Sequence, residues 1–352
     1  MKKNINMKTR VQIALVVCMC GLFPTVQSGF AQGSLTPTGA PGPTMKTLTQ
    51  VEPRTPVATN TTPGDASDLF VITNSGSYYL TTNIAGASGK SGIEILANNV
   101  TLDLNGFTLQ GVASSIVGIY IPAAQTNITV RNGTLSGWAD AGVCSSNVNS
   151  LNLVLERLSV DGNDYETQEG IFVQGAGVVR DCNSCNNGES GIYLGSGIVS
   201  GCKADGNALD GINTGNDVLI TGCTVTGNGG YGIATGVVCK VADCIVANNM
   251  FGGIVTSDNS QITGCHVNGN SLGGISITSF SLVRDNMVDY QQQTTSTPGI
   301  CASDSRNRVE ANNITRCGIG LQVTSSQISS FATASAAARV WLTALRRATV
   351  WG

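Results

Sequence analysis

The sequence predicts an all-β solenoid, and three observations support this fold class. Cysteine recurs five times at spacings of 20 or 21 residues, each time followed five residues later by Asn and nine residues later by a Gly-Ile pair. Between these positions the apolar residues alternate over only two or three inward positions, which is typical of short strands joined by tight bends. Glycine accounts for 44 of the 352 residues and charged residues for only 12%, which excludes a highly charged disordered chain. Stacked copies of this unit are expected to form a right-handed, single-stranded parallel β-helix of about eleven turns, each of roughly 21 residues.

The first 31 residues have the features of a secretory signal peptide. A basic region precedes the apolar stretch 11–23, which is too short to span a bilayer, and small residues predict cleavage before Gln32. Cleavage would leave no transmembrane segment. We therefore expect a protein that is secreted, periplasmic or held at the cell surface, with lipid attachment through Cys18 or Cys20 as the alternative.

The two segments that flank the repeats differ from them in composition. Residues 32–69 are proline-rich, since six of the nine prolines lie between positions 33 and 64, and predict either a leader that caps the first turn or a disordered linker. Residues 328–352 are rich in Ala and Arg and contain two of the three Trp residues. They predict a cap over the open end of the solenoid or, alternatively, a frame artefact that replaces further repeats.

The solenoid itself is predicted over residues 70–327, because Gly-Ile or Gly-Val pairs continue on both sides of the regular copies. The cysteines should stack in one inward column as free thiols that pack like small hydrophobic groups, although their expected separation also permits disulfides. The asparagines should stack at a bend, since Asn tolerates a left-handed backbone and its amide can bond to the same amide one turn away. The two ladders are Cys182, Cys202, Cys223, Cys244 and Cys265, and Asn187, Asn207, Asn228, Asn249 and Asn270. Asn286 and Asn312 take the cysteine position in later copies.

These Asn-x-x-x-Gly-Ile units, together with the stretch NNVTLDLNGFTL at 98–109, resemble a known family. The chain is similar to the bacterial right-handed parallel β-helix repeat proteins of the pectate-lyase-like superfold, and to their uncharacterised exported branch, over about residues 70–325. The resemblance implies the fold but not one activity, because this superfold hosts polysaccharide lyases, hydrolases, epimerases, phage tailspikes and adhesins. The Gly-His-Gly and Asp-Pro-His-Glu signatures of its polygalacturonase-like and alginate-epimerase-like members are absent from the sequence.

The charge of the chain limits its partners. Residues 32–338 contain 12 basic and 22 acidic residues, a net charge of −10. Nucleic acid is not an expected partner, because neutralising phosphates requires a basic face. An extracellular polysaccharide or a cell-envelope surface is the expected partner, and the acidic surface is compatible with divalent cations.

Three aromatic residues are candidates for binding: Tyr120, Phe172 and Tyr193. Each occupies an outward position beside a Gly-Ile or Gly-Val strand, and Phe172 and Tyr193 are 21 residues apart, so they should stack on adjacent turns. Exposed aromatic rings on a flat sheet can support sugar rings. The alternative is that they pack beneath a neighbouring insertion.

Four carboxylates form the candidate metal site: Asp161, Asp164, Glu166 and Glu169. They lie in an insertion before Gly170 and could gather around Ca²⁺, which prefers flexible oxygen ligands; the alternative is a solvated loop. A pectate-lyase-like site would combine Asp161, Asp164 and Glu166 with Arg157 or Arg180 as the base, as the resemblance implies.

Two further features carry no expected chemistry. The single histidine, His266, should point outward between Ile245 and Met287, with no carboxylate to activate it. The pair Cys182 and Cys185 lies on a strand-to-bend segment, whereas redox motifs of this spacing normally begin a helix.

The predicted function is that of an exported monomer which binds polysaccharide or another surface, or serves as a structural module, without catalysis. The alternative is a Ca²⁺-assisted polysaccharide lyase or a related carbohydrate-active enzyme.

Overall fold

A computed structural model describes residues 52–163, 169–291, 296–324, 330–333 and 340–342. The predicted signal peptide (1–31), residues 32–51 of the leader, Asp164, Glu166 and most of the tail 328–352 lie outside the described residues. Contacts divide the chain into two units, Met1–Glu52 and Pro53–Gly352. The second unit contains every strand of the described residues, and these residues include no helix that could span a membrane.

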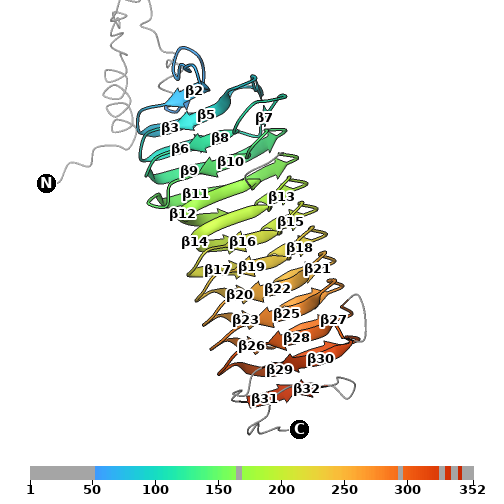
Figure 1. Ribbon diagram of the computed structural model, residues 1–352. Coiled ribbons are helices and arrows are strands. Elements are labelled where there is room, and N and C mark those ends of the chain that lie inside the picture. The colour runs from blue at the N-terminus through green and yellow to red at the C-terminus, as the bar shows by residue number, and fades with distance from the viewer. Residues whose placement is uncertain (1–51, 164–168, 292–295, 325–329, 334–339, 343–352) are drawn as a thin grey trace, which may run out of the picture. The chain divides into compact units, whose positions relative to one another are not determined.

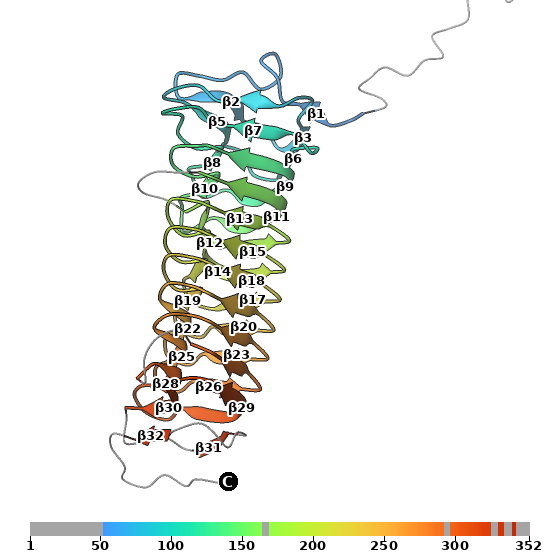
Figure 2. The same ribbon diagram turned by 90° about the vertical axis from the view of Figure 1, so that its right-hand side faces the viewer.

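The second unit is a parallel β-solenoid of about twelve turns, in which the strands stack one above another (Figures 1 and 2). Three parallel sheets run along it, and some long strands bend from one sheet into the next. The first sheet contains β2 (Asp68–Ile72), β5 (Ser91–Ile95), β8 (Ile119–Ile121), β10 (Val143–Ser145), β12 (Ile171–Arg180), β14 (Ile192–Ser200), β16 (Ile212–Thr214), β19 (Ile233–Thr235), β22 (Gly252–Thr256), β25 (Gly273–Ile277), β28 (Pro298–Ala302), β30 (Ile319–Val323) and β32 (Val340–Leu342).

The other two sheets complete each turn. The second sheet contains β1 (Thr55–Pro56), β3 (Gly76–Tyr79), β6 (Val100–Asp103), β9 (Thr126–Ser136), β11 (Leu151–Asp161), the ends of β12 and β14, β17 (Val218–Thr221), β20 (Lys240–Ala242), β23 (Gln261–Thr263), β26 (Leu282–Arg284), β29 (Arg308–Thr315) and β31 (Ser330–Thr333). The third sheet contains β4 (Ile84–Ala85), β7 (Thr108–Gln110), the ends of β9, β11 and β29, β13 (Asn183–Cys185), β15 (Lys203–Asp205), β18 (Thr224–Thr226), β21 (Ile245–Ala247), β24 (His266–Asn268) and β27 (Met287–Asp289).

Strand pairing starts and ends beyond the predicted limits of the solenoid. β1 pairs with β3, and β2 pairs with β5, so part of the proline-rich segment 32–69 already belongs to the first turn. In the tail 328–352, β31 pairs with β29 and β32 pairs with β30. The described parts of the tail therefore continue the stack.

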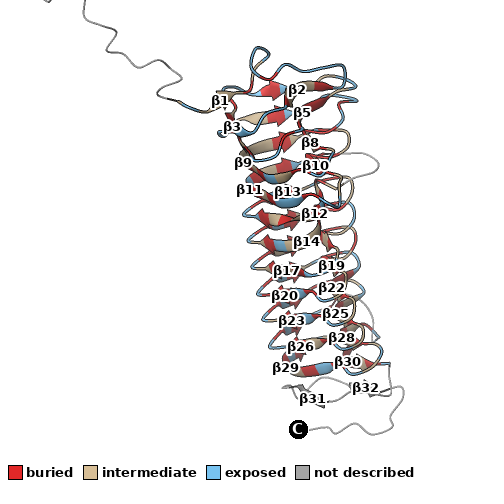
Figure 3. Cartoon of the chain, turned by 90° about the vertical axis from the view of Figure 1, so that its left-hand side faces the viewer, coloured by how far each residue is buried: buried red, intermediate tan, exposed pale blue. Residues whose placement is uncertain are grey.

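The core is a set of stacked columns of identical or similar side chains. In the first sheet the isoleucines after each Gly stand in register from Ile192 to Ile300, and each is at most 2% exposed. Buried residues recur along the stacked strands in the same way (Figure 3). Glycine is needed at Gly211, Gly232, Gly253 and Gly274 because a Cβ there would collide with a valine of the third sheet, as it would at Gly232 with Val246. The Gly-Ile pair is thus one unit of cross-core packing.

The bends follow a different rule from the one predicted for asparagine. The left-handed residue is the one before each ladder Asn, for example Asn186 (φ 53), Gly206 (φ 65) and Asn248 (φ 57), and not the ladder Asn itself. The prediction that the ladder Asn itself adopts the left-handed backbone is therefore wrong, because the left-handed residue lies one position before it. The ladder asparagines contribute through their side-chain amides, which bond to one another.

The amide ladder is continuous through the middle of the solenoid. Each Oδ1 accepts two hydrogen bonds from the turn before it, one from the backbone N–H and one from the side-chain amide of the preceding ladder residue. The amide-to-amide distances from Asn187 to Asn270 are all 2.9 Å, and the ladder extends to Asn163 at one end and to Gln291 at the other. A buried polar column is stable in this form because nearly all of its groups are paired.

The cysteine ladder is a column of buried free thiols at the bend between the second and third sheets. The thiols donate to carbonyl oxygens, as Cys202 does to that of Val179 at 3.5 Å. Contact with the neighbouring thiol, together with burial, raises the pKa of Cys202 to about 12. Asn286 and Asn312 continue the column as a short amide ladder, with a distance of 2.9 Å between them. The ladder cysteines themselves, from Cys182 to Cys265, act as packing groups.

Candidate functional site

One outward row of side chains crosses the first sheet. The strand register places Glu94, Tyr120, Cys144, Phe172 and Tyr193 opposite one another on β5, β8, β10, β12 and β14. The three aromatic residues are half-buried. The rings of Phe172 and Tyr193 lie 5.2 Å apart at an interplanar angle of 30°. All three predicted binding residues therefore share one row, and two of them stack directly.

Cys144 fills the gap in this row between Tyr120 and Phe172. It packs with Val117 and Ala141 into a small cluster separate from the main core, and both rings lie against that cluster. Burial, followed by the charges of Asp140 and Glu169, raises the pKa of the Cys144 thiol to about 12. The thiol is neutral at physiological pH and serves as an apolar part of the row, so the strip from Tyr120 to Tyr193 is continuous.

A groove of about 400 Å³ opens at the Tyr120 end of the row. Tyr120, Cys144 and Val117 line it together with carboxylates from the first two turns and with Asp140. The sheet thus offers an apolar strip that leads into an acidic hollow.

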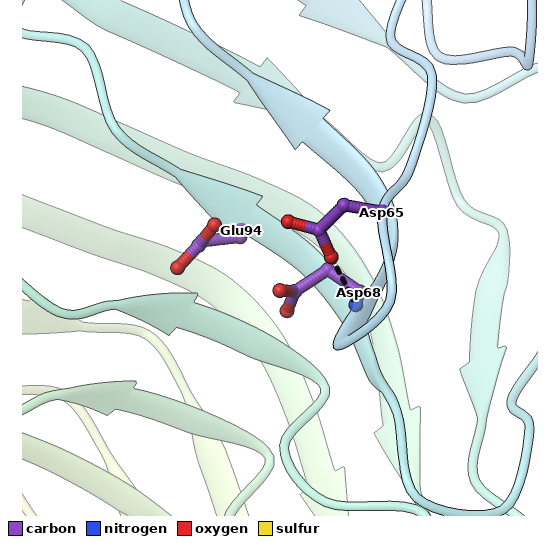
Figure 4. A group of neighbouring side chains, drawn as sticks. All are labelled: Asp65, Asp68 and Glu94. Atoms are coloured by element: carbon purple, nitrogen blue, oxygen red, sulfur yellow. Dashed lines mark hydrogen bonds between the residues drawn. The ribbon is translucent and has the colours of Figure 1, made fainter.

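Three carboxylates meet in this groove: Asp65, Asp68 and Glu94 (Figure 4). Asp65 precedes β2, Asp68 begins β2, and Glu94 lies on β5; one oxygen of each lies within 4.8 Å of the others. Asp65 Oδ1 accepts hydrogen bonds from the backbone N–H groups of Ser67 (2.7 Å) and Asp68 (2.9 Å). Lys90 donates to the main-chain carbonyl oxygens of Asp65 and Asp68.

The environment separates the acidities of these carboxyl groups. The two backbone N–H groups hold the pKa of Asp65 below its ordinary value. Burial and the charge of Asp65 raise the pKa of Asp68. Burial and the charges of both aspartates raise the pKa of Glu94. Three like charges in one partly desolvated place oppose one another, and a cation would relieve that repulsion.

Comparison with known proteins supports the fold. A family profile described as "Right handed beta helix region" matches residues 117–263. Among solved structures, the A-module of the mannuronan C-5 epimerase AlgE6 of Azotobacter vinelandii has a TM-score of 0.62 and 19% identity, covering 79% of this chain and 90% of that one. The A-module of AlgE4 from the same organism has a TM-score of 0.60 and 16% identity, covering 79% and 91%. A search of curated protein sequences finds no significant match. The chain folds as a right-handed parallel β-helix.

Within this β-helix, the predicted acidic site is only partly described. Asp164 and Glu166 lie outside the described residues. Asp161 is exposed and accepts a hydrogen bond from the side-chain amide of Asn186 at 2.9 Å. Glu169 lies near Glu189 and Asp140; burial, followed by these two charges, raises its pKa to about 7. The charged groups that raise the pKa of Glu169 are thus other acids.

The two arginines considered as a base are both engaged. Arg157 Nη2 donates to Glu156 Oε1 at 2.6 Å, and Arg180 Nε donates to Glu156 Oε2 at 2.8 Å. Their guanidinium groups form ion pairs with Glu156, a buried carboxylate of β11, rather than with Asp161. His266 is exposed on β24 between Ile245 and Met287, and its position matches the prediction.

The acidic groove was missed from the sequence. Asp65 and Asp68 fall in the segment predicted as a leader, and Glu94 lies in one of the irregular early copies. Their meeting depends on the β2–β5 register, which sets Asp68 opposite Ser91. The available signal was the pair of aspartates just before a strand-like run, followed one turn later by an outward Glu after a Gly-Ile pair.

Proposed function

We propose that this β-helix binds a polysaccharide, without catalysis, along the outer face of its first sheet. The observation that carries this proposal is the row of Tyr120, Phe172 and Tyr193 in register on β8, β12 and β14. The row spans three strand spacings, which is about 14 Å at roughly 4.8 Å per turn. A sugar chain could lie along the solenoid axis, with its apolar C–H faces on the rings and its hydroxyls toward the flanking polar groups.

The charge around the row restricts the ligand. Glu94 lies in the same row, and Asp140 and Glu169 lie close enough to Cys144 to influence its thiol. A polyanion would be repelled by these acids unless cations bridge it to the surface. We therefore favour a neutral polysaccharide, or a uronate polymer held through cations. The two fold neighbours are named for mannuronan, a polysaccharide, and this supports the ligand class.

Catalysis as a lyase is less well supported by the contacts. A lyase needs a free cationic base beside its acidic cluster, and Arg157 and Arg180 both pair with Glu156. Lys90 is next to the acidic groove but donates to main-chain carbonyls there. A binding role requires only the aromatic row.

The test is a set of binding isotherms of the mature chain against neutral and uronate polysaccharides. Replacement of a ring that contacts the ligand, in Phe172→Ala or Tyr193→Ala, should weaken binding by about tenfold, or about 1.4 kcal/mol. Phe251→Ala is the matched control, because Phe251 is an exposed aromatic residue outside the row. Its ring contacts that of Tyr231, with 5.6 Å between the ring centroids. Absence of binding across the panel, or equal weakening by the control, would refute the proposal.

A further inference from the structure

The acidic groove has a composition suited to a cation. Its three carboxylates come from two adjacent turns, and all of the converging groups offer oxygen. Two oxygens that each lie about 2.4 Å from one Ca²⁺ ion are at most about 4.8 Å apart. The mutual separation of at most 4.8 Å between the oxygens of Asp65, Asp68 and Glu94 falls within that limit.

A second observation concerns Asp68 alone. This residue is only 4% exposed, and its Oδ1 atom is buried without a hydrogen-bond partner. A buried carboxylate oxygen without a partner is costly. Figure 4 shows that the Asp68 carboxyl group points into the space it shares with Asp65 and Glu94. The carboxyl group is therefore directed at a place where a ligand could complete its contacts.

We propose that Asp65, Asp68 and Glu94 form a binding site for a divalent cation of the Ca²⁺ type, which ties β2 to β5. Hard oxygen ligands favour Ca²⁺ or Mg²⁺ over the transition metals. Flexible carboxylates from different segments suit the irregular geometry of Ca²⁺ better than the strict octahedron of Mg²⁺. Lys90 does not take the place of the cation, since its described hydrogen bonds go to main-chain carbonyls of Asp65 and Asp68.

The site differs from the one that the sequence predicted. That prediction placed Ca²⁺ in the insertion at Asp161, Asp164, Glu166 and Glu169, in the middle of the solenoid. The present proposal places it at the N-terminal turns. It does not depend on carbohydrate binding, because the cation is measured without any sugar, so either proposal can fail alone.

The test is calorimetric titration of Ca²⁺ into the chelator-treated full chain, with Mg²⁺ as a comparison. Wild type should bind one Ca²⁺ at this site, and Asp68→Asn or Glu94→Gln should weaken that binding at least about tenfold. Asp304→Asn is the control, since Asp304 is exposed in the C-terminal half and Asn tolerates its left-handed backbone (φ 62). The control should bind as wild type does.

Thermal unfolding with Ca²⁺ and with chelator separates metal binding from a loss of folding. Saturating Ca²⁺ should raise the Tm of wild type by on the order of 5 °C. With chelator, Asp68→Asn should unfold at a higher temperature than wild type, because it removes a buried like charge; with Ca²⁺ this order should reverse. No Ca²⁺ binding by wild type would overturn the proposal. So would binding that survives in Asp68→Asn/Glu94→Gln but is lost in Asp161→Asn/Asp164→Asn.

Discussion

Replacing Asn228 by Ala removes one rung from the middle of the amide ladder. Asn228 is fully buried. Its Nδ2 donates to Asn249 Oδ1 at 2.9 Å and to the carbonyl of Ala204 at 3.2 Å. Its Oδ1 accepts from the backbone N–H of Asn207 at 3.0 Å and from the Asn207 amide at 2.9 Å. Four hydrogen bonds therefore depend on this one side chain.

The expected cost follows from these contacts. A net contribution of about 0.5–1.5 kcal/mol per bond gives about 2–6 kcal/mol, and we expect about 4 kcal/mol. The backbone N–H of Asn207 would lose its acceptor, so the cost should not fall below the middle of that range. The turns on both sides would be affected, because each rung joins two neighbours.

Urea unfolding followed by circular dichroism measures this cost. Asn183→Ala is the control: Asn183 is exposed on β13, beside the corresponding bend two turns earlier. Its change should alter the unfolding free energy by less than about 0.5 kcal/mol. The slope of free energy against urea must match among variants for the comparison to hold. Equal stability of the two variants would refute the view that the ladder holds the turns together.

Three further predictions concern charge and packing. Glu169 has a folded-state pKa raised to about 7, so its ionisation favours the unfolded chain. Stability should therefore fall from about pH 4.5 to 7, and Glu169→Gln should remove that fall. Unfolding titrations at pH 8 should show a difference of at most about 3 kcal/mol. Asp289 has its pKa lowered to about 2, chiefly by its hydrogen bond with Arg316. The stabilisation of the fold by the ionised Asp289 is present above pH 4 and lost toward pH 2. Asp289→Asn should therefore cost about 1–2 kcal/mol at pH 7 and little at pH 2. Gly232→Ala should cost about 1–3 kcal/mol through its collision with Val246, and adding Val246→Ala should cost less than the sum of the two changes.

The stacking of repeats could be predicted from the sequence because a fixed spacing reports directly on which residues lie above one another. The 21-residue offset between Phe172 and Tyr193 becomes a strand register and a ring contact. The Asn and Cys ladders follow from the same arithmetic. The sequence could not show which residue of the bend is left-handed, because in a dipeptide such as Asn186-Asn187 both residues tolerate that backbone conformation.

The acidic groove could not be predicted, for a physical reason. Its residues lie in the first two turns, where the repeat is irregular and no fixed spacing links Asp68 to Glu94. Their proximity is set by the pairing of β2 with β5 and by the bend at Asp65, which is held by two backbone hydrogen bonds. Composition suggested divalent cations, but could not say which acids converge.

The most direct test of binding along the row is hydroxyl-radical footprinting of the chain with and without an oligosaccharide of the polymer it binds. Oxidation of each aromatic side chain is measured by mass spectrometry. Binding along the row should protect Tyr120, Phe172 and Tyr193 at saturating ligand and leave the exposed Phe251 and Tyr290 unchanged. Protection at Phe251 or Tyr290 with none along the row would contradict it.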